Sequence, residues 1–209
     1  SINLSHYKGG VGKTTLALNL AISLKASILD LDGQQSSILF NKLRKLKGHE
    51  PLECFVADTE SEMKDIFRQF TGNDKILIVD SGGYDSDINR FAMLSANMLI
   101  TPVSPSQVEL FGLQKYETIL KQISEKYGRD FKTNVIINNA DIRSKGAITE
   151  LKKFVAKRSK NFDLFKTIIH NRADYKKSYG EGASVVEMTA GSKAAFEIEQ
   201  LTKEIRKEI

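Results

Sequence analysis

The stretch "HYKGGVGKTT", residues 6–15, decides the fold of this chain. It follows a short apolar run at residues 2–5 and leads into a helical pattern at residues 14–24. Glycines between a strand and a helix let the backbone wrap closely and turn its N–H groups onto phosphate oxygens. The dipole of the following helix adds positive potential at the same point. The stretch therefore predicts a phosphate-binding loop.

The loop departs from the full phosphate-loop pattern in its first half. The pattern GxxxxGK[ST] places a glycine at position 7, where this chain has Tyr7. The second half is intact, so we expect Lys13 to reach the β- and γ-phosphates and the Thr14 hydroxyl to bind Mg²⁺. Thr15 is expected to touch the α-phosphate. The residues expected around the phosphates are Gly9, Gly10, Val11, Gly12, Lys13, Thr14 and Thr15.

Short apolar runs alternate along the chain with longer helical patterns. Strands are expected at residues 2–5, 27–30, 75–80, 98–102, 133–138 and 166–169. Helices are expected at residues 14–24, 36–47, 60–70, 86–95, 109–127, 147–160 and 192–207. This alternation predicts an α/β fold, a mainly parallel twisted sheet with helices on both faces. With no composition break, we expect one P-loop NTPase domain over residues 1–209, with its ligand at the carboxyl ends of the strands.

Composition excludes several classes of protein. Cys54 is the only cysteine, so a disulfide framework or a CxxC metal site is not expected. The three histidines are scattered, which disfavours a zinc site. No apolar run is long enough to span a membrane, and the chain does not begin with a signal-peptide pattern. We therefore expect a cytoplasmic protein.

Positive charge is concentrated late in the chain. Residues 143–177 hold eleven Lys/Arg and three acidic residues, a local charge of +8 in a chain whose net charge is +5. A polyanion such as DNA is the expected partner, and a solvated basic face without a partner is the alternative. The candidate DNA contacts are Lys152, Lys153, Lys157, Arg158, Lys160, Arg172, Lys176 and Lys177.

The second lysine of the loop, Lys8, indicates which family of phosphate-loop proteins the chain resembles. The sequence "KGGVGKT" resembles the deviant Walker A box of the ParA/MinD superfamily of P-loop ATPases. This resemblance implies that Lys8 reaches across a dimer interface to the nucleotide of the other subunit. A cation placed there completes the charge clamp on the transferring phosphoryl group, as an arginine finger does. An ordinary loop cation is the alternative.

Two further segments resemble family motifs that carry carboxylates. The segment "DLDGQ", residues 30–34, resembles a D-x-D-P-Q box in which Gly33 replaces the proline. The resemblance implies that Asp32 or Asp30 orients the attacking water and links to Mg²⁺ through solvent, and we favour Asp32 for the water. The segment "ILIVDSGG", residues 76–83, resembles a Walker B strand. There Asp80 would hold a Mg²⁺-bound water, and Gly82-Gly83 would act as a switch at the γ-phosphate.

The resemblance extends over almost the whole chain. Residues 101–113, "TPVSPSQVELFGL", resemble the segment after Walker B and are assigned to the dimer interface. Asn138 and Asn139 end a strand where an amide could read adenine, and the loop near Arg172 is a further candidate for base contact. Residues 182–201 resemble the final G-x-x-V-x-E segment and C-terminal helix of the family.

Other features select a branch within the family. The last helical pattern is rich in glutamate and lacks the cluster of Trp or Phe near its end that is typical of a membrane-anchoring helix. The single cysteine disfavours iron-protein and metal-carrier relatives. Seven residues precede Lys8, so a helix-turn-helix extension is not expected. We therefore predict a Mg²⁺- and ATP-dependent homodimeric ATPase on the nucleoid that binds double-stranded DNA non-specifically. Its predicted role is plasmid or chromosome partition with a ParB-like centromere-binding partner.

Two alternatives to partition stay open. The first is a ParA-like positioning ATPase whose cargo is a protein assembly, such as a chemoreceptor or flagellar cluster. The second is a small-molecule ligase of the dethiobiotin-synthetase type, which Lys8 and the basic segment disfavour.

Overall fold

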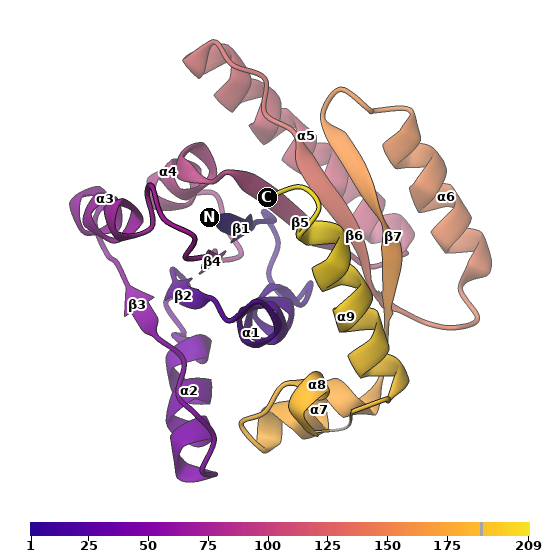
Figure 1. Ribbon diagram of the computed structural model, residues 1–209. Coiled ribbons are helices and arrows are strands. Elements are labelled where there is room, and N and C mark those ends of the chain that lie inside the picture. Colours follow the sequence, from indigo (N-terminus) through magenta and orange to yellow (C-terminus); the bar gives the residue numbers. More distant parts are fainter. Residues whose placement is uncertain (189) are drawn as a thin grey trace.

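One parallel sheet organises the molecule (Figure 1). The computed structural model describes residues 1–188 and 190–209. Their strands have the order β3-β2-β4-β1-β5-β6-β7, and every neighbouring pair is parallel. The strands are β1 Ile2–Leu4, β2 Ser27–Asp30, β3 Cys54–Val56, β4 Leu77–Asp80, β5 Met98–Val103, β6 Thr133–Ala140 and β7 Phe162–His170. Because β1 lies between β4 and β5, the loop after β1 opens where the strand order reverses, a typical ligand site.

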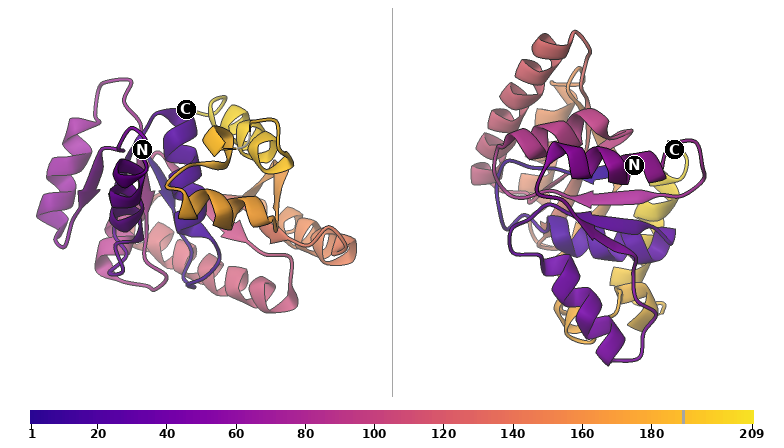
Figure 2. Two further views of the ribbon diagram at one scale, coloured as in Figure 1. Left: turned by 90° about the horizontal axis from the view of Figure 1, so that it is seen from below. Right: turned by 90° about the vertical axis from the view of Figure 1, so that its left-hand side faces the viewer.

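Helices lie on both sides of the strands, as the two views of Figure 2 show. They are α1 Lys13–Leu24, α2 Ser36–Leu46, α3 Glu60–Gln69, α4 Asp87–Ser95, α5 Gln107–Tyr127, α6 Lys145–Ala156, α7 Ala173–Gly180, α8 Val185–Met188 and α9 Lys193–Ile205. Alternate residues of each strand point to opposite faces of the sheet and pack in separate hydrophobic clusters. Ile28 and Ile78 pack with α1 and α9, whereas Leu29 and Val79 pack with α3 and α4. A third cluster joins β5 and β6 to α5 and α6.

Local sequence explains where key helices begin and end. The Ser106 side chain caps α5 by accepting from Glu109 N, and Gly128 ends that helix with φ 64°. Helix α1 begins instead after Gly12, with φ 90° and no side-chain cap. Its first N–H groups therefore remain available to a ligand.

The predicted α/β fold and its parallel sheet are confirmed, and the differences concern short or half-exposed elements. Strand β3 was missed because it is a three-residue edge strand, and α7 and α8 because they are short. Strand β7 begins at Phe162 rather than at residue 166, since an edge strand carries polar residues that weaken its apolar pattern. Helix α6 ends at Ala156, before the expected residue 160.

Within the described residues, no helix is both long and apolar enough to cross a bilayer. The segment that resembles the family's C-terminal pattern includes Thr189, which lies outside the described residues.

Candidate nucleotide-binding site

The phosphate loop forms a compact cradle between β1 and α1. Gly10 and Gly12 adopt φ 78° and 90°, a region that favours glycine. A Cβ at Gly12 would collide with the side-chain amide of Asn138. Lys13 is buried and folds back so that its Nζ donates to Lys8 O at 3.0 Å. Burial lowers the pKa of Lys13, while Asp80 and Asp32 act in the opposite direction. An anion placed in this loop would meet a poorly solvated cation, which strengthens their attraction.

Two predicted carboxylates meet at the carboxyl ends of neighbouring strands. Asp30 of β2 and Asp80 of β4 are directly paired in register. Asp30 accepts from Asp32 N at 3.0 Å and from Ser37 N at 2.9 Å, so it fixes the turn into α2. Asp32 is half-buried and accepts from Gln34 N at 3.0 Å. The structure therefore brings both acids of the "DLDGQ" segment beside the strand that ends in Asp80.

The buried carboxylate of Asp80 is suited to binding a cation. It is 1% exposed, and its Oδ1 has no hydrogen-bond partner among the described residues. Desolvation raises its pKa to about 7, although a hydrogen bond with the Thr14 side chain opposes the shift. Hard oxygen donors of this kind suit Mg²⁺, which is commonly held through one or two carboxylates, water and substrate phosphates. Thr14 and Asp80 therefore fit the predicted magnesium ion.

The loop after β4 packs directly against the phosphate loop. A Cβ added at Gly83 would lie 2.6 Å from both the N and the Cα of Gly9. Only glycine permits this backbone approach without displacement. The two loops are therefore mechanically linked, which is the arrangement that a phosphate-sensing switch requires.

Lys8 does not point freely into solvent, because its Nζ forms an ion pair with Glu109 of α5. The hydrogen bond to Glu109 raises the pKa of Lys8. Lys8 N also donates to His6 Nδ1 at 3.0 Å. His6 is buried, and its ring stacks on Tyr7 and Tyr116. Sequence reasoning missed the roles of His6 and Glu109. Their signals were a histidine two residues before Lys8 and an acid in the segment assigned to the dimer interface.

The candidate base contacts are in different environments. Asn138 Nδ2 donates to Val11 O at 2.7 Å, so this amide nitrogen supports the phosphate loop. Asn139 is exposed and adopts φ 55°. Arg172 Nη2 donates to Glu197 Oε1 at 2.6 Å, and Glu197 also pairs with His170. Among the described residues, the Asn139 side chain forms no hydrogen bond, so it is available at the strand end.

The candidate DNA contacts fall into two groups on opposite faces of the sheet. One group follows α6, whose apolar side packs in the cluster with α5. There Lys152, Lys153 and Lys157 are exposed, while Arg158 lies 3.7 Å over the Phe154 ring and pairs with Glu117 at 3.1 Å. Lys160 lies 3.7 Å from Asp130. The second group, Lys176 and Lys177, is exposed on α7, whose tyrosines pack in the cluster with α1. The basic segment therefore does not form one continuous patch.

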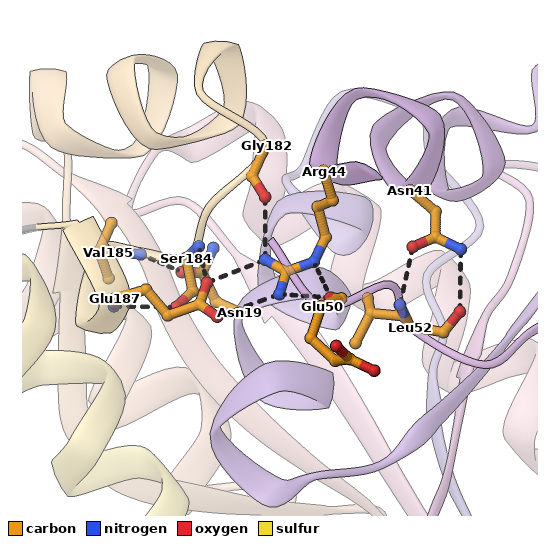
Figure 3. Close-up of polar contacts among 9 residues, drawn as sticks. All are labelled: Asn19, Asn41, Arg44, Glu50, Leu52, Gly182, Ser184, Val185 and Glu187. Carbon is orange, nitrogen blue, oxygen red and sulfur yellow. Dashed lines mark hydrogen bonds and ion pairs between the residues drawn. The ribbon is translucent and has the colours of Figure 1, made fainter. Parts of the chain in front are cut away.

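A buried polar network joins α2 to the C-terminal segment (Figure 3). Arg44 is 3% exposed, and its donors bind Glu50 O, Gly182 O and both carboxylate oxygens of Glu187 at 2.8–3.0 Å. Asn19 of α1 accepts from Val185 N at 2.9 Å. The G-x-x-V-x-E segment therefore anchors both the phosphate-loop helix and the helix that follows Asp30.

The fold and this site define a P-loop nucleotide-binding domain. Residues 4–185 match the CobQ/CobB/MinD/ParA nucleotide binding domain, and the chain belongs to this family. The ParA/MinD resemblance seen in the loop is thereby confirmed. This is a family of ATPases.

Two relatives resemble the chain over most of its length. It is 23% identical to the maintenance of carboxysome distribution protein A of Halothiobacillus neapolitanus, over 98% of this chain and 95% of that protein. The protein of the same name from Gloeobacter kilaueensis is 25% identical over 86% of this chain and 81% of its own length.

Solved structures share the fold. The structure of apo McdA from Cyanothece superposes with a TM-score of 0.70 and 17% identity, covering 97% of each chain. The MinD cell division protein of Aquifex aeolicus gives 0.71 and 19% identity, with 100% of this chain and 97% of that one covered.

Proposed function

We propose that residues 1–209 form one deviant Walker A ATPase domain that positions a protein assembly inside the cell. The observation that carries this proposal is the similarity to two carboxysome distribution proteins, over 98% and 86% of the chain. It favours the protein-cargo alternative over plasmid or chromosome partition. The cargo class is a large protein assembly, and partition with a ParB-like partner is the second candidate.

The proposed cycle begins with ATP binding in the phosphate loop. Lys13 and the N–H groups of α1 hold the phosphates, while Thr14 and Asp80 hold the magnesium site. Magnesium, when bound, neutralises charge on the β- and γ-phosphates. Asp32 orients the attacking water, with Asp30 fixing the loop. Asn139 is the candidate for base contact.

In the proposed dimer, Lys8 of each subunit serves the nucleotide of the other. Tyr84, Val108 and Phe111 are exposed in segments that follow the carboxyl ends of β4 and β5. A second copy of the chain would cover them. Dimerisation doubles the lysine-rich face of α6, which supports ATP-dependent, non-specific binding to DNA. A cargo-bound adaptor protein would then stimulate hydrolysis and release the dimer from the nucleoid.

The proposal is tested by DNA binding in a salt series with ATP, ADP or no nucleotide. We expect a sequence-independent, salt-sensitive complex with ATP alone, lost in Lys8→Ala. The triple change Lys152→Ala, Lys153→Ala and Lys157→Ala should remove DNA binding while ATP-dependent dimerisation persists. A matched triple change of Lys64, Lys75 and Lys203, which lie off α6, should leave DNA binding intact. DNA binding that is independent of nucleotide would contradict the cycle.

Deletion of the gene separates the two cargo classes. Loss of a positioning ATPase leaves plasmid and chromosome inheritance normal and displaces a protein assembly from its regular spacing. Fluorescence microscopy of the assembly and plasmid-retention counts give the two readouts. Plasmid loss with normal protein positioning would favour the partition role.

A further inference from the structure

The ion pair between Lys8 and Glu109 connects two segments that are 101 residues apart in the chain. Glu109 lies in the first turn of α5, where its backbone N–H is capped by Ser106. Lys8 lies in the phosphate loop. The pair therefore joins the phosphate loop to α5. This helix also carries Val108 and Phe111, two of the exposed apolar residues that the proposed dimer would cover.

Glu109 depends on Lys8 for its charge balance. Its side chain is 12% exposed, against 39% for Lys8. Its second oxygen, Oε2, is buried and has no hydrogen-bond partner within the described part of the chain. Removing the cation beside a largely buried carboxylate leaves the carboxylate charge poorly compensated, which is unfavourable. Departure of Lys8 would place Glu109 in that condition.

The backbone around Lys8 is also held by α5. His6 Nδ1 accepts from Lys8 N, and the His6 ring stacks on Tyr116 at 5.8 Å between centroids. Gly112 permits the approach, since a Cβ there would lie 3.3 Å from the Tyr7 ring and 3.5 Å from the His6 ring. Main chain and side chain of Lys8 are thus both fixed within the single subunit.

We propose that Glu109 is a latch that retains Lys8 in the isolated subunit and so opposes assembly of the ATP-bound dimer. This inference rests on the proposed function, in which Lys8 must leave its own subunit's contacts to reach the other nucleotide. A partner copy that covers Val108 and Phe111 supplies the interactions that offset release of the latch. The pair therefore raises the protein concentration that the ATP-bound subunits need to form a dimer.

The test compares Glu109→Gln with Glu125→Gln, which removes the same charge from an exposed position on the same helix. Sedimentation with saturating MgATP gives the protein concentration at half-dimerisation. We expect this concentration to fall on the order of tenfold in Glu109→Gln, a typical coupling between sites, and to stay unchanged in Glu125→Gln. In a Lys8→Ala background, which is not expected to dimerise with ATP, Glu109→Gln should not restore dimerisation, because the latch then has nothing to retain.

A second measurement reads the latch without a dimer. Limited acetylation of the nucleotide-free protein, followed by mass spectrometry, reports the reactivity of Lys8. We expect several-fold faster labelling of Lys8 in Glu109→Gln than in wild type or Glu125→Gln. Unchanged labelling overturns the latch, and so does weaker dimerisation of Glu109→Gln, which would show that Glu109 assists Lys8.

The outcomes distinguish failure of the proposed latch from failure of the proposed dimer cycle on which it rests. If wild type dimerises with ATP and Glu109→Gln behaves like wild type, the latch is wrong and the dimer cycle stands. If neither wild type nor Glu109→Gln dimerises, although both bind MgATP, the proposed dimer cycle is wrong and the latch falls with it. Circular dichroism and thermal melting of each variant confirm that the comparison is made on folded protein.

Discussion

His6 is a buried, neutral base beside two lysines. Desolvation, reinforced by Lys13 and Lys8, lowers its pKa to about 3. A neutral ring keeps Nδ1 as an acceptor for Lys8 N, which holds the loop backbone in place. His6 thus stabilises the backbone of the phosphate loop, a role that the glycine-rich motif does not predict.

The first prediction concerns acid stability. Because the pKa of His6 is lower in the folded protein than the ordinary value of 6.5, the unfolded chain binds more protons at this site below that pH. The free energy of unfolding should therefore fall as pH drops from about 6.5 towards 3, by up to about 1.4 kcal/mol per pH unit from this group.

His6→Asn should lack that component, since an Asn Oδ1 can accept from Lys8 N and does not titrate. Urea denaturation at pH 7, 6 and 5 measures the effect, with His49→Asn as the matched control. A stability difference between His6→Asn and wild type that is constant across this range would show that His6 is not a buried neutral base.

At the scale of elements, the site depends on contacts between loops and helices that follow different strands. The loop after β4 touches the loop after β1 through Gly83 and Gly9. Helix α2, which begins just after the Asp30 turn, is tied to the C-terminal segment through Arg44. The first contact links two loops at the carboxyl ends of the strands, and the second holds the helix that follows Asp30.

Gly83→Ala should separate the two loops. Its Cβ would lie 2.6 Å from Gly9 backbone atoms, so one loop must move. We expect the affinity for a fluorescent ATP analogue to fall about tenfold, equivalent to about 1.4 kcal/mol, within the usual cost of overpacking. Gly180→Ala, at the end of α7, is the control because nothing lies within 4 Å of its added Cβ. Equal affinities for the two variants would argue against the loop contact.

Arg44→Met should destabilise the protein by about 3 kcal/mol, because it removes the guanidinium that binds the Glu187 carboxylate and two backbone carbonyls. Lys47→Met breaks the Lys47–Glu181 pair at the surface, which joins nearby parts of the same two segments. That change should cost about 0.5 kcal/mol or less. Urea unfolding of both variants tests the contrast. A similar cost for both would mean that Arg44 does not act as a buried anchor.

At the scale of the whole molecule, nucleotide binding should stabilise the entire sheet, because the site joins the ends of its central strands. Saturation at about 100 times Kd adds about 2.7 kcal/mol. For a domain of this size, that raises Tm by about 5–10 °C. Calorimetry with and without MgATP measures the shift. Lys13→Ala should show almost none, and an equal shift in that variant would place the nucleotide elsewhere.

The sequence by itself determined the parallel α/β fold, the alternation of strands and helices apart from β3, α7 and α8, and the phosphate-loop class of site. These follow from local patterns, because periodicity and glycine placement act over a few residues. The "HYKGGVGKTT" stretch follows β1 and runs into the first turn of α1, as its pattern predicts. The fully apolar β4 strand is buried and ends in Asp80, as a strand covered on both faces should.

Only the tertiary structure decided which partner each polar side chain takes. Lys8 pairs with Glu109, Asn138 binds Val11 and Arg172 pairs with Glu197. The α6 and α7 lysines, which are close in sequence, lie on opposite faces of the sheet. Ion pairs and hydrogen bonds form only within a few ångströms, and those distances depend on strand order and helix packing. Sequence periodicity encodes which face a residue occupies, whereas the packed fold sets what it meets there.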